Sequence, residues 1–448
     1  MPIDGLNYLR GRQGHYTRLK LFILKRKNFI RLSGLMAGTG ALAGFQSLHA
    51  TAGNACSTAE KNLRNPAIHQ IVPITRDERK ERITRAQRFL LENKMAALII
   101  EAGTSMEYFT GISWWPSERT MVAVIPASGE IIYICPGFEE TRFRELITVG
   151  QKLYIWQEDE NPYEQIVLAL KEAGISSGKI GIEEQTRFFI VDGIRKTATR
   201  LEYVSGDPVT IPCRMFKSEA ELALMQKASD ITVAAMKTGI SNLKEGISSD
   251  VISAIINKAH TDMGAKPEFA LVLFGESSAK PHGSIKPQQL KKGDIVLMDC
   301  GCKVEGYCSD ITRTIVFGAE PTKRQLEIWN LEKKAQAAGF AAARIGTNCE
   351  RVDEAARKVI TDAGFGPGYK LPGLPHRTGH GIGMDGHEWG NMVKGNQLLL
   401  QTGMCFSIEP TISIPGEFGI RLEDCVYMTG EGPKWFSQPA IAIDKPFV

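Results

Sequence analysis

The sequence predicts two domains in succession, an α/β domain followed by an α+β domain. Between residues 76 and 210, amphipathic helical stretches alternate with short apolar strands, a pattern typical of an α/β domain. From about residue 213, two long helical stretches come first and strand-like segments follow. The chain has 448 residues, 43% of them hydrophobic and 23% charged, which is enough for two domains with separate cores.

The first 52 residues are predicted to form an export signal. Eight Lys or Arg and one Asp occupy the first thirty-one residues, and a Gly/Ala-rich apolar stretch then leads to Ala50-Thr51-Ala52. The apolar stretch is too short and too rich in glycine to span a bilayer, and 26-RKNFIR-31 resembles a twin-arginine signal with Lys27 in place of the second arginine. We expect an exported, periplasmic protein without a membrane span in its mature form. A disordered basic tail on a cytoplasmic protein is the alternative.

Residues 53–75 are predicted to be a linker, because they are polar and contain Pro66 and Pro73. The net charge of +4 is mild, and much of the positive excess lies in the first thirty-one residues, so no nucleic-acid partner is expected. The nine cysteines are an odd number without compact spacing, which argues against a disulfide framework.

The first domain, residues 76–212, is assigned from its elements in order. An amphipathic helix over 77–94 precedes an apolar strand over 96–100. Strands over 121–126 and 131–135, a helix over 163–174 and a strand over 179–184 follow.

The second domain, residues 213–448, begins with helices over about 218–241 and 249–263 and continues with a predicted hairpin. Its strands, 294–304 and 307–317, are joined by a tight turn around Glu305-Gly306. If facing positions sum to 609, Asp299 lies directly opposite Asp310. Directly opposed Cβ atoms are about 4.5 to 5.5 Å apart, so the two carboxylates would converge and would need a cation between them.

Three cysteines lie between these two aspartates and offer a competing interpretation. Cys300 is adjacent to Asp299 on a strand, so it should point to the opposite face as a small apolar side chain. Cys302 and Cys308 lack the second pair that zinc modules need. A further alternative is that one Asp is only a turn or cap residue.

A second carboxylate pair is predicted in 404-MCFSIEPTISIPGEFGIRLEDCV-426. The strands on either side of Pro415-Gly416-Glu417 place Glu409 opposite Glu423, because both lie seven residues from Gly416. Between the two pairs, 376-HRTGHGIGMDGHE-388 carries three histidines among glycines, which let the backbone come close to a ligand. Two converging carboxylate pairs and a histidine segment favour a metal centre.

Four carboxylates and an imidazole form a hard, oxygen-rich ligand set. Such a set suits two divalent ions, with Mn²⁺ as the first expectation and Co²⁺, Zn²⁺ or Fe²⁺ as alternatives. Two ions that share bridging carboxylates can activate a water and polarise a carbonyl. The sequence therefore predicts hydrolysis of an amide or ester.

These residues resemble the pita-bread metallopeptidases, a family that includes methionine aminopeptidase, aminopeptidase P and prolidase. The likeness covers roughly residues 76–448, and 213-CRMFKSEAEL-222 resembles the aminopeptidase P, prolidase and creatinase branch. It implies a creatinase-like N-terminal domain followed by a pita-bread catalytic domain. It rests on the order His282, Asp299, Asp310, His380, His387, Glu409 and Glu423, with His282 in 281-PHGS-284 and the others in Asp-x10-Asp, GHGIGxxxHE and IEP…RLED.

The resemblance also implies roles for single residues. The metal ligands would be Asp299, Asp310, His380, Glu409 and Glu423, with Asp310 and Glu423 bridging. Glu409 would also handle protons, and His282 and His387 would bind the substrate carbonyl and stabilise the tetrahedral intermediate. His376 and Arg421 would shape the pocket around the leaving residue or its carboxylate.

The activity that the resemblance implies is removal of an N-terminal residue that precedes proline, from dipeptides or longer peptides. Relatives commonly read EPGIY where this chain has 409-EPTIS-413, which bears on the proline preference. The alternatives are a hydrolase or lyase of a small non-peptide metabolite and a catalytically silent peptide-binding module. A homodimer is expected. The aromatic run 108-YFTGISWWPSER-119 could contribute a contact to the partner subunit, and the alternative is that Trp114 and Trp115 are ordinary packing residues.

Overall fold

A computed structural model describes residues 71–448. The expected export signal, residues 1–52, and residues 53–70 of the expected linker lie outside the described residues. No helix within 71–448 is both long enough and apolar enough to cross a membrane.

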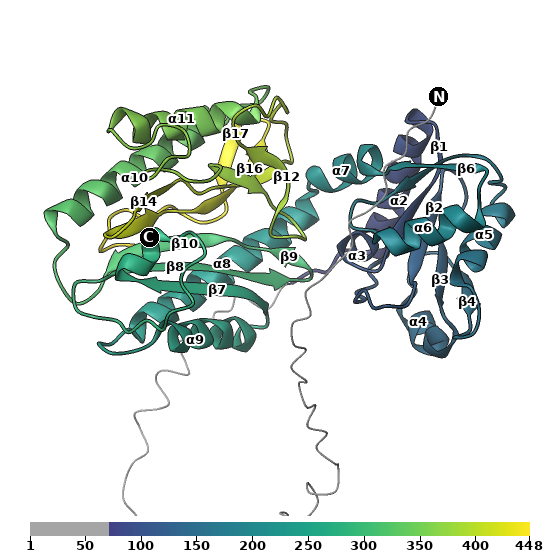
Figure 1. Cartoon of the computed structure of the whole chain (residues 1–448), viewed down its shortest axis with the longest axis horizontal. Coiled ribbons are helices and arrows are strands. Elements are labelled where there is room, and N and C mark those ends of the chain that lie inside the picture. Colours follow the sequence, from purple (N-terminus) through teal and green to yellow (C-terminus); the bar gives the residue numbers. More distant parts are fainter. Residues whose placement is uncertain (1–70) are drawn as a thin grey trace, which may run out of the picture. The chain divides into compact units, whose positions relative to one another are not determined.

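The first domain is built on a six-stranded mixed sheet (Figure 1). The strand order is β4-β3-β2-β1-β5-β6, in which β1–β2 and β2–β3 are antiparallel and the other neighbours are parallel. The strands are β1 (Met95–Glu101), β2 (Val122–Pro126), β3 (Ile132–Pro136), β4 (Lys152–Trp156), β5 (Gly178–Ile182) and β6 (Leu201–Ser205).

Helices cover both faces of this sheet, which explains why its central strand is apolar without alternation. Leu98 and Ile100 of β1 belong to a core that includes α2 (Arg76–Glu92). Ala97 and Ile99, on the opposite face, belong to a core that includes α5 (Pro162–Glu172) and α6 (Phe188–Thr197). Shorter helices, α3 (Thr104–Thr110) and α4 (Glu140–Leu146), complete the α/β domain.

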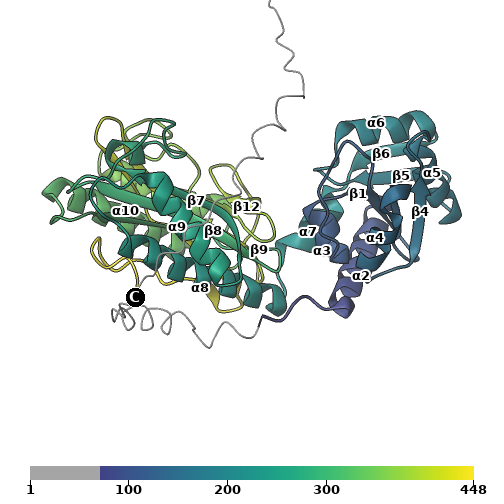
Figure 2. The same ribbon diagram turned by 90° about the horizontal axis from the view of Figure 1, so that it is seen from below.

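The second domain follows α7 (Asp207–Met215) and consists of two halves of similar build (Figures 1 and 2). The first half has α8 (Glu219–Ser241), α9 (Ser249–Asp262) and a sheet of β7 (Lys266–Phe274), β8 (Ile295–Val304), β9 (Tyr307–Cys308) and β10 (Ile311–Val316). The second half has α10 (Lys323–Ala342), α11 (Cys349–Asp362) and a set of shorter strands. These are β11 (Gly379–Gly381), β12 (Glu388–Met392), β13 (Cys405–Ile408), β14 (Thr411–Ile414), β15 (Phe418–Arg421), β16 (Asp424–Thr429) and β17 (Gly432–Trp435).

The two halves repeat each other in detail. Each first helix begins with a capping box, at Ser218 for α8 and Thr322 for α10, which satisfies the free N–H groups of the first turn. In each half, the turn between the two helices exchanges a pair of backbone hydrogen bonds with a distant leucine. The partner is Leu290 in the first half and Leu400 in the second, with distances of 2.8 and 2.9 Å in both.

The predicted register of the first hairpin is wrong by two residues. Asp299 pairs with Thr312 rather than with Asp310, so facing positions sum to 611. The reason lies in the turn: Glu305 and Gly306 are its two central residues, and both have left-handed backbones with φ of 48° and 86°. This is the geometry of a two-residue hairpin turn of type I′, and it fixes the register of both strands.

The second hairpin follows the predicted register. The pairs Ile408↔Asp424 in β13–β16 and Thr411↔Arg421 in β14–β15 share one offset, which continues through Glu409 and Glu423 between the two ladders. An isolated bridge between Thr312 and Glu423 then joins the two halves of the domain. The carboxylate pairs of the two hairpins are thereby brought to one place.

Candidate metal centre

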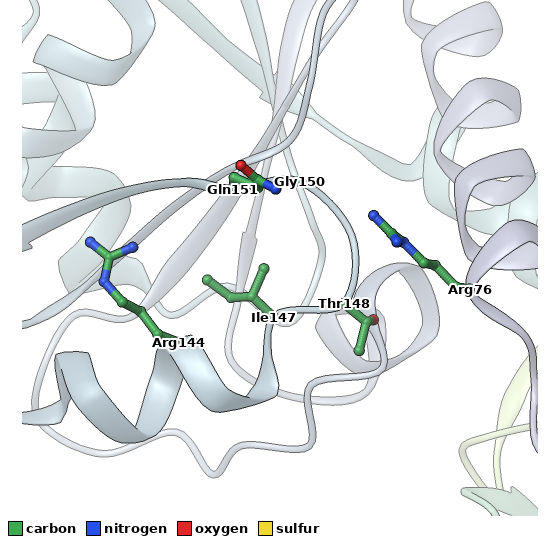
Figure 3. A pocket seen from close by; sticks show the side chains of 6 residues that line it. All are labelled: Arg76, Arg144, Ile147, Thr148, Gly150 and Gln151. Carbon is green, nitrogen blue, oxygen red and sulfur yellow. The ribbon is translucent and has the colours of Figure 1, made fainter.

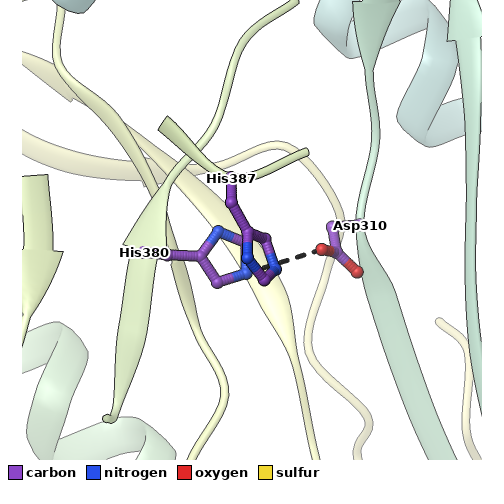
Figure 4. Close-up of side chains that lie close together, drawn as sticks. All are labelled: Asp310, His380 and His387. Atoms are coloured by element: carbon purple, nitrogen blue, oxygen red, sulfur yellow. Dashed lines mark ion pairs between the residues drawn. The ribbon is translucent and has the colours of Figure 1, made fainter. Parts of the chain in front are cut away.

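The five residues predicted as metal ligands converge at the seam between the two halves. Asp299 lies on β8 and Asp310 lies between β9 and β10, while His380 lies on β11 of the second half. Potential ligand atoms lie within 4.8 Å of one another in three groups: Asp299, Asp310 and Glu423; His380, Glu409 and Glu423; and Asp310, His380 and His387. Figure 4 shows the third group, with His380 Nε2 3.6 Å from Asp310 Oδ2.

The acidic residues of this cluster repel one another in a nearly dry environment. Burial, together with Asp299 and Glu409, raises the pKa of Asp310 well above its ordinary value. Burial and Asp310 raise the pKa of Glu423 in the same way, and burial raises the pKa of Glu409 to about 7. Ionising all of them at neutral pH therefore requires a cation.

The donor set fits divalent metal ions. Asp299 Oδ1 and Glu423 Oε1 are buried and have no hydrogen-bond partner, so a ligand atom is free on each half of the site. Oxygen donors with one imidazole are the set that hard divalent ions prefer. Asp299, Asp310, His380, Glu409 and Glu423 are the residues that could hold them.

His380 is arranged as a metal ligand. Its Nδ1 lies 3.0 Å from the Gly381 carbonyl, which can only accept, so Nδ1 carries the proton and Nε2 keeps its lone pair. Nε2 lies 3.3 Å from Glu409 Oε1. Burial, followed by His387, lowers the pKa of His380 to about 3, so the ring is neutral. A hydrogen bond that fixes the tautomer in this way is the usual support of a metal-binding histidine.

His387 lies beside His380, with 3.9 Å between the ring centroids. Its Nδ1 is 3.1 Å from Nη2 of Arg377, and because a guanidinium can only donate, Nδ1 accepts and the proton sits on Nε2. Burial and then Arg377 lower the pKa of His387, which keeps the ring neutral. His282 is exposed in the wall of the same cavity, on the loop that follows β7.

His376 and Arg421 also lie in this cavity, but both already have partners in the chain. His376 bonds the Arg377 carbonyl through Nδ1 at 2.7 Å and Thr411 Oγ1 through Nε2 at 3.0 Å. Arg421 donates to Asp299 Oδ2 at 2.5 Å and to Thr312 Oγ1 at 3.1 Å. Arg421 therefore orients a predicted metal ligand, a contact that sequence spacing did not reveal.

The cavity that contains these residues has a volume of about 880 Å³, and its wall includes all five predicted ligands. Phe269 and Leu271 of β7 add an apolar side. A separate hollow of about 610 Å³ on the first domain, shown in Figure 3, is lined by Arg76, Arg144, Ile147, Thr148, Gly150 and Gln151. That hollow has no acidic or histidine side chain and cannot provide a metal site of this kind.

The cysteines near the site are packing residues. Cys300 is fully buried and lies in an apolar core with Val272 and Met298, on the face of β8 away from Asp299. Cys302 is also buried, and its sulfur contacts the hydroxyl of Thr232 at 3.3 Å. All eight cysteines among the described residues are buried and free.

Sequence reasoning missed a buried ionic cluster that holds the turn before β12. Arg214 donates to Asp385 at 2.7 Å and to Glu388 at 2.6 Å, and Lys217 donates to Glu388 at 2.8 Å. Burial raises the pKa of Glu388, but Lys217 and Arg214 outweigh this effect and lower it to about 2. His387 lies between the two anchored carboxylates. The charged residues Arg214 and Lys217 in 213-CRMFKSEAEL-222 were the sequence feature that could have indicated this cluster.

Comparison with known protein families and sequences supports the predicted family for both domains. Residues 223–430 match metallopeptidase family M24, and residues 82–216 match the creatinase/prolidase N-terminal domain. An uncharacterized peptidase of Schizosaccharomyces pombe is 37% identical over 381 residues, which are 81% of this chain and 82% of the relative. A putative dipeptidase of Bacillus subtilis is 33% identical, covering 78% of this chain and 96% of the relative.

Solved structures agree with the predicted fold. A prolidase from Thermococcus sibiricus has a TM-score of 0.74 and 29% identity, covering 80% of this chain and 96% of that one. An Xaa-Pro dipeptidase from Bacillus anthracis has a TM-score of 0.71 and 27% identity, and the match covers 80% of this chain and 97% of that one. The predicted order of a creatinase-like domain and a pita-bread domain is thus confirmed. The chain belongs to metallopeptidase family M24 and is a metal-dependent peptidase.

Proposed function

We propose that this protein is a dinuclear-metal exopeptidase that hydrolyses the bond between an N-terminal residue and a following proline. The observation that carries the proposal is the convergence of four carboxylates and His380 at one wall of a cavity that also contains His282 and His387. The prolidase and Xaa-Pro dipeptidase among the similar solved structures support the proline preference.

In this proposal, Asp299, Asp310, His380, Glu409 and Glu423 would hold two divalent ions, and Asp310 and Glu423 would serve as ligands to both. The bound ions would supply a Lewis acid and an activated water. Mn²⁺ is the first choice, because the donor set is rich in oxygen.

The other side chains of the site then have separate tasks. Glu409 takes and returns a proton near the attacked carbon, and burial that raises its pKa to about 7 suits it to both directions. His387 directs its Nε2–H toward the substrate carbonyl, because Arg377 occupies the other ring nitrogen. His282 approaches the same carbonyl from the opposite loop. Donors placed in this way stabilise the negative charge of a tetrahedral intermediate.

The surroundings of the leaving residue differ from the EPGIY pattern of relatives. Thr411, in place of the glycine, bonds His376, and Ser413, in place of the tyrosine, is buried with an unpartnered hydroxyl oxygen. Neither of these two residues lines the cavity directly, and the aromatic ring that relatives carry at the second position is absent from Ser413. We propose that proline is preferred but that small residues in its place are also accepted.

The test is an assay of the purified protein with Mn²⁺ against Xaa-Pro dipeptides, Xaa-Pro-Xaa tripeptides and matched Xaa-Ala peptides. We expect metal-dependent release of the first residue, with Xaa-Pro ahead of Xaa-Ala. The two peptide lengths decide between a dipeptidase and an aminopeptidase. Absence of metal-dependent cleavage of every peptide would refute the proposal.

We also propose that the mature protein is exported and forms a homodimer. The basic start and Ala50-Thr51-Ala52 support export, and the resemblance to aminopeptidase P and prolidase supports the dimer. Mass spectrometry of the protein recovered from the periplasm should show an N-terminus near residue 53. Light scattering on the same sample should give twice the mass of the chain.

A further inference from the structure

The guanidinium of Arg377 stands out in the cavity because no acidic side chain of residues 71–448 forms an ion pair with it. Arg377 is partly buried and lines the cavity together with the predicted metal ligands. Its side chain donates to Nδ1 of His387 at 3.1 Å, so this neighbour accepts through a ring nitrogen and offers no negative charge. Among residues 71–448, no carboxylate lies within ion-pair distance of it.

The other basic side chains of the cavity are placed differently. Arg421 is fully engaged by Asp299 and by the Thr312 hydroxyl, so its charge is already balanced. His376 is neutral, because burial lowers its pKa to about 4, and both of its ring nitrogens are bonded within the chain. Lys280 is exposed at the rim. Arg377 is therefore the partly buried cation of the cavity that has no ion-pair partner among residues 71–448.

The position of Arg377 limits which part of a substrate can reach it. Arg377, His387 and His380 follow one another at 3.1 Å and 3.9 Å, so one imidazole separates the guanidinium from the carboxylate cluster. A peptide advances at most about 3.3 to 3.6 Å per residue. A group that binds Arg377 must therefore lie within about two residues of the scissile bond.

We propose that Arg377 is a specificity-determining residue that binds a carboxylate of the peptide substrate; this inference rests on the proposed function. Guanidinium and carboxylate match in charge and in planar geometry, and the pair is strongest in a partly dehydrated site. Two carboxylates lie within reach: the free C-terminal carboxylate of a dipeptide, and the side chain of an acidic N-terminal residue.

The experiment compares two pairs of peptides, each differing in one carboxylate. Ala-Pro against Ala-Pro-amide reports on the C-terminal carboxylate, and Asp-Pro-amide against Asn-Pro-amide reports on the acidic side chain. The Mn²⁺-loaded wild type is compared with Arg377→Gln, Arg377→Lys and the matched control Lys280→Gln. Bound metal and the melting temperature are measured for each variant, so that misfolding is recognised.

In the wild type, kcat/KM should favour the carboxylate member of one pair, and Arg377→Gln should reduce that preference roughly 10- to 100-fold. Arg377→Lys, which keeps the charge but not the fork geometry, should restore part of it. Lys280→Gln should change it by less than about threefold, because an exposed charge is screened. The pair that responds identifies the carboxylate. An unchanged preference in Arg377→Gln, or an equal loss in Lys280→Gln, would overturn the inference.

A binding measurement tests the role of Arg377 even if the proposed peptidase activity is not found. If the wild type hydrolyses none of the four compounds, the proposed function fails, and calorimetry with their reduced-bond analogues then decides about Arg377. Tighter binding of one carboxylate member, abolished by Arg377→Gln, supports the inference. Equal affinities within both pairs refute it.

Discussion

Asp310 is one of three residues, with His380 and Glu423, that connect the potential ligand groups of the proposed metal centre. It belongs to two of the three potential ligand groups, one with Asp299 and Glu423 and one with His380 and His387. It is almost fully buried, and burial together with Asp299 and Glu409 raises its pKa well above the ordinary value. Such a side chain gains its charge only when a cation is bound beside it.

Replacement of Asp310 by alanine should remove metal and activity together. The proposed centre shares Asp310 between two ions, so its loss would leave them without a common ligand, and we expect turnover to fall by at least about a thousandfold. Elemental analysis of the purified variant should show bound metal falling toward zero. Asp250→Ala, at an exposed position in α9, should retain both. A variant that lacks Asp310 yet keeps two metals and full turnover would contradict the bridging role.

The sequence allowed the candidate site residues to be named, even where it did not give the correct strand pairing between them. A register error of two residues leaves every side chain on its original face, because side chains of a strand alternate with a period of two. Asp299 and Asp310 therefore remain on one face of the hairpin, as diagonal rather than direct neighbours. The bonds of Arg377 to His387 and of Arg421 to Asp299 join distant segments, and no local pattern encodes them.

At the scale of elements, the turn between β11 and β12 carries His387, the proposed carbonyl-binding residue, and is held by contacts outside the cavity. Asp385 and Glu388 flank His387, and both accept hydrogen bonds from the fully buried Arg214. The side chain of Thr104 adds a further bond to Asp385 at 2.7 Å. The turn is thus fixed on both sides of the histidine.

Asp385→Asn should reduce turnover without loss of metal. The variant keeps the volume of the side chain but weakens its bond to Arg214, so His387 would shift while the five predicted ligands stay in place. We expect kcat to fall roughly tenfold, at a cost in stability of about 1 to 3 kcal/mol. Kinetics with elemental analysis provides the check. Ser105→Ala, which removes a bond to Arg214 but leaves the turn intact, is the control and should have a much smaller effect on kcat.

For the whole molecule, the buried carboxyls couple stability to pH and to metal. Glu409 has a pKa of about 7 in the metal-free fold and an ordinary value of 4.5, and the pKa of Glu423 is raised as well. The folded protein therefore binds more protons than the unfolded chain. Without metal, its stability should fall as pH rises through this interval.

The stabilisation by metal should accordingly grow with pH. We expect the difference in melting temperature between Mn²⁺-loaded and chelator-treated protein to increase from about pH 5.5 to about pH 8. Ionisation of the carboxyls strengthens metal binding and destabilises the empty site at the same time. Differential scanning calorimetry at several pH values gives the comparison. A difference that shrinks with rising pH would show that the acidic cluster does not bind the ions.

The two-half build of the second domain gives the ions a further role as a removable cross-link. One half contributes Asp299 and Asp310, and the other contributes His380, Glu409 and Glu423. Without ions, the described contacts at this point include the bridge between Thr312 and Glu423 and the bonds of Arg421. Removal of the ions by a chelator should therefore weaken the contact between the two halves before either half unfolds. In a hydrogen-exchange measurement, the backbone amides of β10 and β15 should then exchange faster, while those of α8 and α10 stay protected.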